Sequence, residues 1–177
     1  VYAQTWAVLP EFTELVKKVS PAVVNITAVR GGKDRMGIPG DQEVPEFFRK
    51  FFDERQQSPS PTAGSGFIIS ADGYILTNNH VVEGAKEINV ALSDRRERLA
   101  EVIGTDKLSD LALLKIDEKD LPFVEMGSSE NLEPGEWVVA IGSPFGFELS
   151  VTAGIVSAKG RSLPSMTTAN YVPFIQT

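Results

Sequence analysis

The feature that most constrains the fold is a pair of short apolar runs separated by an Asp-Gly turn. The runs are residues 67–69 and 74–76, and Asp72 and Gly73 lie between them. Asp-Gly is a dipeptide suited to the positive φ angles of a tight hairpin turn, and the flanking residues favour extended backbone. The stretch therefore predicts a β-hairpin whose second strand delivers His80, the only histidine in the chain, at its exit.

The position of His80 makes it a candidate general base. A residue at the exit of a sheet strand is held by rigid backbone and still reaches a cleft. A histidine side chain has an ordinary pKa of about 6.5, so it can take and return a proton near neutral pH. The alternative is that this single histidine is a surface or hydrogen-bonded residue, and the hairpin alone does not decide between the two.

A second candidate, Asp110, lies thirty residues after His80, at the head of an apolar run at 111–116. The run predicts a buried strand, and a carboxylate entering it needs a partner because burying an unpaired charge is costly. The imidazole N–H of His80 would be such a partner, and Asp110 would then fix the ring tautomer and stabilise the imidazolium. Two alternatives stay open: Asp110 closes a turn through its own side chain, or Lys107 or Lys115 neutralises it.

Other patterns complete an antiparallel barrel. Apolar residues at helical spacing predict one amphipathic helix, at 10–19, that packs against the barrel. Strands are predicted, besides the hairpin and 111–116, at 22–29, 88–92 and 99–103. Six such strands can close on themselves without leaving free edges.

The last part of the chain predicts only three strands, at 136–141, 150–158 and 171–176. Three strands with an apolar face and open edges make a poor independent domain. We therefore expect the printed residues to be part of a longer chain.

Composition limits the classes of function. The chain has 17 basic against 24 acidic residues and a formal net charge of −7, which argues against nucleic acid or an anionic membrane surface as the main partner. With no cysteine and one histidine, we expect no disulfide framework and no metal site. No segment approaches the roughly 20 apolar residues that span a bilayer.

Residues 31–63 interrupt the strand pattern with glycine, proline, serine and charges. The segment is far longer than an ordinary connection, so it is either disordered or functional. Its apolar residues are four phenylalanines, Phe47, Phe48, Phe51 and Phe52, together with a few aliphatic side chains. The aromatic residues suit docking into a partner pocket, and the alternative is a flap folded back on its own barrel.

The motifs around both candidate residues resemble a known protease family. The matching segments are GSGFII (64–69), GYILTNNHVV (73–82), SDLALLKI (109–116) and AIGSPFG (140–146). They resemble, in family order, the protease domain of the HtrA (Deg) proteins. The resemblance implies an all-β, trypsin-like double β-barrel with a short N-terminal helix, in which the first barrel is complete and the second is incomplete in this chain.

The resemblance also implies a division of the chain and the roles of its residues. The division is an N-terminal segment and helix at 1–20, a first barrel at 21–120 with a long loop at 31–63, a linker at 121–135, and the start of the second barrel at 136–177. His80 and Asp110 match the first two members of a catalytic triad. The family's nucleophilic serine lies in a Gly-Asn-Ser-Gly-Gly segment that this chain lacks, so we expect it after Thr177. Ser65 and Ser143 match other family positions.

The activity implied is that of a cofactor-independent serine endopeptidase of protein quality control, located in the periplasm and acting on unfolded polypeptides. The family forms homotrimers or larger assemblies through its N-terminus, which makes Tyr2 and Trp6 candidate interface residues. The phenylalanines of the long loop would regulate a neighbouring active site, and PDZ domains would follow the barrels. The alternative function is a chaperone-like module that binds unfolded protein without cutting it.

Overall fold

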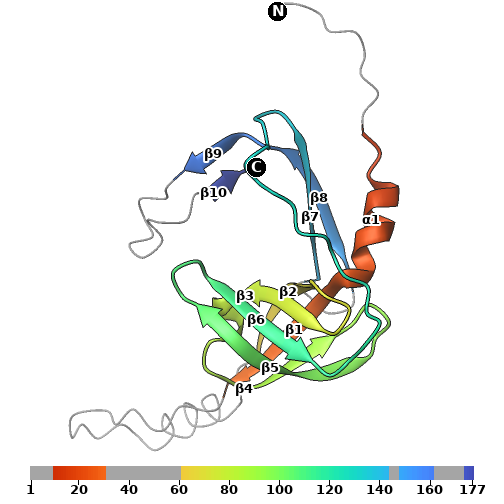
Figure 1. Cartoon of the computed structure of the whole chain (residues 1–177), viewed down its shortest axis with the longest axis vertical. Coiled ribbons are helices and arrows are strands. Elements are labelled where there is room, and N and C mark those ends of the chain that lie inside the picture. Colours follow the sequence, from red (N-terminus) through yellow and green to blue (C-terminus); the bar gives the residue numbers. More distant parts are fainter. Residues whose placement is uncertain (1–9, 31–60, 144–147, 162–173) are drawn as a thin grey trace, which may run out of the picture.

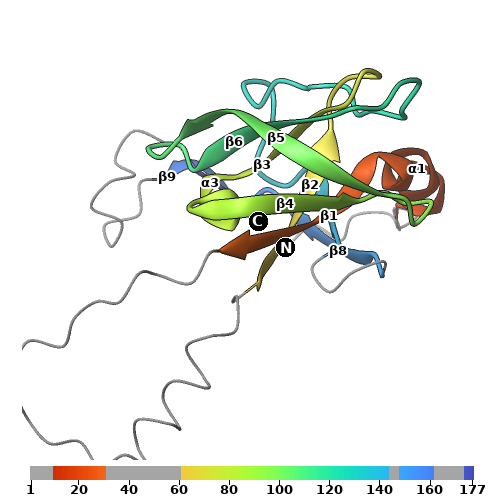
Figure 2. The ribbon, with the colours of Figure 1, turned by 90° about the horizontal axis from the view of Figure 1, so that it is seen from below.

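The structure is a computed structural model, which describes residues 10–30, 61–143, 148–161 and 174–177. These residues form a closed antiparallel barrel with two small two-stranded sheets on one side of it (Figure 1). Figure 2, the view from below, looks onto β4 and β5, with β8 and β9 behind the barrel. No helix within the described ranges is long and apolar enough to cross a membrane.

The six-stranded barrel predicted from the sequence is confirmed, with the strand order β1-β2-β3-β6-β5-β4. The strands are β1 (Val23–Arg30), β2 (Pro61–Ile68), β3 (Tyr74–Asn78), β4 (Ala85–Ala91), β5 (Glu97–Asp106) and β6 (Leu111–Ile116). Because side chains alternate along a strand, each strand turns one set of residues inward. The most deeply buried of these are aliphatic: Val24, Ile26, Ile68, Ile75, Val90, Leu114 and Ile116.

Strand β2 begins earlier than the sequence pattern indicated. Residues 61–63 were predicted to belong to the long loop, but Pro61 to Ala63 pair with Val29 to Thr27 of β1. They are therefore part of the barrel wall. Proline fits there because it is the first residue of its strand.

The hairpin between β2 and β3 forms as predicted, with a different turn. Ser70 to Gly73 make the turn, in which the Gly73 N–H donates to the Ser70 carbonyl at 3.1 Å. Gly73 has a φ of 97°, whereas Asp72 does not adopt a positive φ. A side chain at Gly73 would also bring its Cβ to 2.5 Å from the Ile116 carbonyl oxygen. Only glycine therefore fits this position.

The N-terminal helix is shorter than predicted. Helix α1 spans Thr13–Val19, and one turn of 3-10 helix, Ser20–Ala22, leads into β1. None of the residues of α1 is fully buried, and the apolar residues Val16 and Val19 are half-buried, so the apolar face of the helix is covered less completely than expected. The residue before the helix, Phe12, instead contacts Trp137 of β7, with 5.8 Å between ring centroids.

The second half of the chain forms two hairpin-like pairs. Strand β7 (Trp137–Gly142) pairs with β8 (Ser150–Ile155), and β9 (Ala158–Arg161) pairs with β10 (Phe174–Gln176). The single strand predicted over 150–158 is wrong, because residues 156–157 belong to no strand and separate β8 from β9.

The segment that follows β6 stays close to the first barrel. Leu121 is 5% exposed and belongs to the barrel core. Its N–H donates to the Ala71 carbonyl at 3.1 Å, and the Val124 N–H donates to the Ile68 carbonyl at 2.9 Å. The path from the barrel to β7 therefore begins with residues that are fixed to the β2–β3 hairpin.

Candidate active site

His80 lies in a short helix, α3 (Asn79–Val82), directly after β3. The next two residues, Val81 and Val82, are buried in the barrel core and anchor the helix. The glycine at position 64 of β2 makes room for it, since a Cβ on Gly64 would lie 2.6 Å from Cγ2 of Val81. The side chain of His80 remains 67% exposed. The helix therefore holds the backbone of His80 firmly while its ring stays accessible.

Asp110 lies in the turn between β5 and β6 and has a φ of 56°, a left-handed conformation that aspartate tolerates better than most residues. The turn itself is closed by Asp106. Its carboxylate accepts the hydroxyl of Ser109 at 2.7 Å and the N–H of Leu108 at 2.9 Å, and these bonds lower the pKa of Asp106. The alternative in which Asp110 closes the turn is therefore wrong.

Asp110 binds both the backbone and the ring of His80. Its Oδ1 accepts the His80 N–H at 2.9 Å, and its Oδ2 lies 2.6 Å from Nδ1 of the ring. Because an ionised carboxylate can only accept hydrogen bonds, Nδ1 must carry the proton and Nε2 keeps its lone pair. The site can therefore take up a proton at Nε2 and hold the resulting imidazolium beside a carboxylate.

The environment of Asp110 favours its ionised form. Partial burial acts to raise the pKa of Asp110, but the hydrogen bonds from the backbone and ring of His80, with the charge of that ring, outweigh burial and lower the pKa below its ordinary value. The expectation of a buried carboxylate is wrong, since the Asp110 side chain is 42% exposed. Asp110 precedes β6, whose first buried residue is Ala112. Local hydrogen bonding, and not burial in a strand, pairs it with His80.

Further contacts fix the two segments that carry these residues. The Asp110 carbonyl accepts the N–H of Asn79 at 3.0 Å and the side-chain amide of Asn78 at 3.1 Å. On the other side of α3, the Arg30 guanidinium donates to the His80 carbonyl at 2.9 Å. The N–H and the carbonyl of His80 are thus both bound by side chains. The orientation of its ring is set by the contact with Oδ2 of Asp110.

The two lysines that could have neutralised Asp110 have other partners. Lys107 forms an ion pair with Glu83 at 2.6 Å, and this contact raises the pKa of Lys107 and lowers that of Glu83. Lys115 donates to the Ile116 carbonyl at 2.8 Å and lies over the ring of Tyr74. His80 is the partner that the structure gives to Asp110.

The remaining predicted site residues lie outside the described residues, namely Phe47, Phe48, Phe51 and Phe52 of the long loop and Tyr2 and Trp6 of the N-terminus. Within the described ranges, no group of three His, Asp or Glu side chains is arranged to hold a metal ion.

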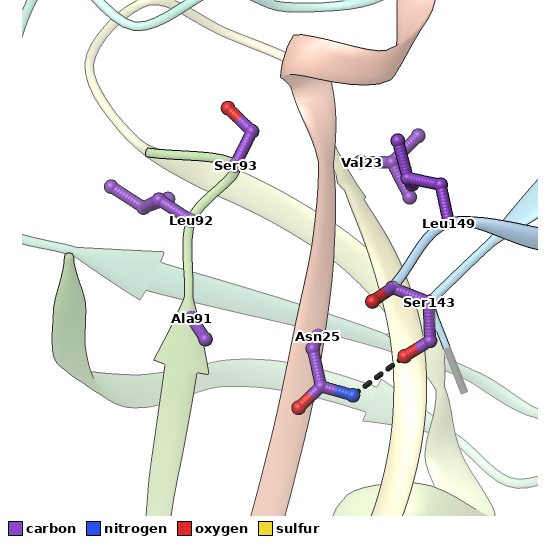
Figure 3. Close-up of a pocket in the computed structure, with 7 residues that line it drawn as sticks. All are labelled: Val23, Asn25, Ala91, Leu92, Ser93, Ser143 and Leu149. Carbon is purple, nitrogen blue, oxygen red and sulfur yellow. Dashed lines mark hydrogen bonds between the residues drawn. The ribbon is translucent and has the colours of Figure 1, made fainter. Parts of the chain in front are cut away.

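One buried polar contact was missed at the sequence level. A small pocket between β1 and Ser143, the residue after β7, is lined in part by Asn25, whose side-chain amide donates to the Ser143 carbonyl at 2.6 Å (Figure 3). The signal was present, because Asn25 is a polar residue inside the β-branched run Val23 to Thr27. A polar side chain in such a run requires a hydrogen-bonding partner if it is buried.

Comparisons with protein families and with curated proteins point to the same class of protein. Residues 64–177 match the model of the trypsin-like peptidase domain. Two similar curated proteins are both named "probable periplasmic serine endoprotease DegP-like": one from Marinomonas sp. (strain MWYL1), 57% identical over 97% of this chain, and one from Hahella chejuensis (strain KCTC 2396), 60% identical over 96% of it. The chain spans only 39% and 37% of the length of these relatives.

Solved structures agree with the sequence relatives. The HtrA-type protease AlgW with a decapeptide has a TM-score of 0.71 at 38% identity, and the same protease with a tripeptide has a TM-score of 0.72 at 37% identity. Each alignment covers 94% of this chain, and 51% and 46% of the respective structures. The resemblance predicted from the motifs is thereby confirmed: this chain belongs to the family of trypsin-like peptidase domains, with relatives of the HtrA (Deg) type.

Proposed function

We propose that the full-length protein is a serine endopeptidase in which His80 is the general base and Asp110 orients it. The observation that carries this proposal is the 2.6 Å contact between Nδ1 of His80 and Oδ2 of Asp110, which leaves Nε2 available to a hydroxyl group. The match of residues 64–177 to the trypsin-like peptidase domain supports the same assignment.

In this mechanism, Nε2 of His80 takes the proton from a serine hydroxyl as the serine oxygen attacks a peptide carbonyl. Asp110 stabilises the imidazolium that forms. The imidazolium then returns the proton to the leaving amine, and an acyl-enzyme remains. His80 next activates a water molecule, which hydrolyses the acyl-enzyme. We place the nucleophilic serine after Thr177, because no serine of this chain lies in the family's Gly-Asn-Ser-Gly-Gly segment.

Unfolded polypeptides in the periplasm are the proposed substrates. The relatives named above are called periplasmic endoproteases, and the AlgW structures contain peptides. We also propose a homotrimer or larger assembly with Tyr2 and Trp6 at its interface, regulation by the phenylalanines of the long loop, and PDZ domains after the barrels. The names of the compared proteins do not favour the alternative of a non-proteolytic binding module.

The test is covalent labelling of the full-length protein with a fluorophosphonate, which reacts much faster with an activated serine than with other side chains. The wild type should be labelled, and His80→Ala should abolish labelling because no base remains to take up the proton. Lys86→Ala, an exposed position on β4, is the control and should be labelled like the wild type. Undiminished labelling of the His80 variant would remove His80 from the mechanism.

A further inference from the structure

The residue after β7, Ser143, is bound to the first barrel through both of its backbone groups. Its N–H donates to the hydroxyl oxygen of Ser65 at 2.8 Å. Its carbonyl accepts the side-chain amide of Asn25 at 2.6 Å, the contact that Figure 3 shows. Ser143 is 4% exposed and Asn25 is 7% exposed. We call these three residues the Ser143 junction.

The two barrel residues of the junction are placed together by the sheet. Asn25 of β1 and Ser65 of β2 are direct partners in the antiparallel register, so their side chains lie on the same face. This is the outer face, because the neighbours Val24 and Ile26 of β1 belong to the barrel core. A polar pair on the outside of a barrel would ordinarily contact water. Here Ser143 covers it.

The junction is also connected to β3, the strand that leads to the helix with His80. The carbonyl of Ser65 accepts the hydroxyl of Thr77 at 2.8 Å, and Thr77 is 5% exposed. Thr77 lies in β3, three residues before His80. Of the four polar residues buried in the described part of the chain, three, Asn25, Thr77 and Ser143, belong to this set of contacts.

We infer that Asn25 and Ser65 are positioning residues, which set where the second half of the domain lies relative to His80. This inference rests on the proposed function. His80 and Asp110 are on the first barrel, whereas a serine located after Thr177 would enter with the second half. Its hydroxyl must come within about 3 Å of Nε2 to transfer a proton. Asn25 and Ser65 touch neither of these groups and act through the backbone of Ser143.

The expected loss of rate follows from how precisely the reacting groups of an enzyme must be placed. A displacement of about 1 Å by a distant change can lower a rate by about 100-fold. Asn25→Ala removes the donor to the Ser143 carbonyl, and Ser65→Ala removes the acceptor of the Ser143 N–H. Each removes one of the two contacts that join the backbone of Ser143 to Asn25 and Ser65, so Ser143 is held less firmly against the first barrel. Binding of an extended substrate is not expected to change to the same degree.

The experiment uses the full-length protein and measures cleavage of fluorescently labelled, unfolded casein together with the rate of fluorophosphonate labelling. Asn25→Ala and Ser65→Ala should each lower kcat by about 10-fold to 100-fold, lower the labelling rate in parallel and leave KM unchanged. Ser65→Thr keeps the hydroxyl acceptor and should restore kcat. The matched control is Asn89→Ala on β4, because the Asn89 amide donates to the exposed Glu87 carboxylate.

The outcomes separate the two proposals. A wild type that neither cleaves casein nor reacts with the fluorophosphonate contradicts the proposed function. An active wild type with unchanged kcat in both alanine variants contradicts the positioning role, as does a kcat that falls without any change in labelling rate. Ser65→Ala also covers the case in which Asn25→Ala fails to fold, since Ser65 is only partly buried.

Discussion

Replacing Asp110 with asparagine in the full-length protein should nearly abolish turnover while leaving the fold in place. Asparagine keeps the shape of aspartate and has one carbonyl oxygen and one amide NH₂ group. The carboxylate of Asp110 accepts two hydrogen bonds, from the His80 N–H at 2.9 Å and from the ring Nδ1 at 2.6 Å. An amide can satisfy only one of these two donors.

The Asp110 contacts in the structure indicate with which of the two donors of His80 the amide oxygen of the introduced asparagine would pair. The backbone N–H of His80 cannot change its role, so the amide oxygen must face it. The NH₂ group then faces Nδ1 and donates to it, which forces the ring proton onto Nε2. A ring protonated at Nε2 cannot take the proton of a serine hydroxyl. The corresponding change in a well-studied serine protease lowers kcat by about 10⁴-fold, which is about 5 kcal/mol of activation free energy.

The assay is kcat for cleavage of unfolded casein, with thermal unfolding as the measure of fold. Asp94→Asn is the matched control: Asp94 lies in the β4–β5 turn and pairs with Arg96 at 2.7 Å. The control should change kcat by less than about twofold, since surface substitutions have small effects. A loss of less than about tenfold for Asp110→Asn would refute the tautomer argument and leave Asp110 with a structural role only.

Two further predictions concern stability. Because the pKa of Asp110 is lowered in the folded protein, its stabilising contribution is complete above the unfolded pKa of about 3.9 and is lost as pH falls through the folded pKa. The difference in Tm between wild type and Asp110→Asn should therefore shrink below about pH 4, and a constant difference from neutral to acidic pH contradicts this. Leu114→Ala should lower the free energy of unfolding by about 2–5 kcal/mol in urea, since Leu114 is 0% exposed, whereas Leu99→Ala, at a 64% exposed position, should cost less than about 0.5 kcal/mol. Equal losses would place Leu114 outside the core.

Local sequence predicted the parts of the barrel that depend on local chemistry. The Asp-Gly dipeptide between two apolar runs predicted the hairpin, and the aliphatic run after Asp110 predicted β6, because these patterns report turn conformation and side-chain alternation directly. The turn itself differed in that only Gly73 has a positive φ. The start of β2 at Pro61 was missed, since residues 61–63 follow a long polar segment and are placed in the strand by pairing with β1.

The contact between the two candidate residues was predicted, but the reason given for it was wrong. His80 and Asp110 were identified from their positions beside strands. Their pairing was argued from the cost of burying Asp110, yet its side chain is 42% exposed. Asp106 closes the turn through residues two and three positions later, which is local information that the sequence contained. The pairing of Lys107 with Glu83 became visible only in the folded structure.

The sequence by itself determined the hairpin, the aliphatic strands and the residue types available for proton transfer, because these depend on neighbours within a few residues. Only the tertiary structure decided which of them meet. The contact between His80 and Asp110 joins α3 to the β5–β6 turn, and that between Asn25 and Ser143 joins residues 118 positions apart. Such contacts follow from closure of the barrel and from the covering of its outer face, and no short stretch of sequence contains that information.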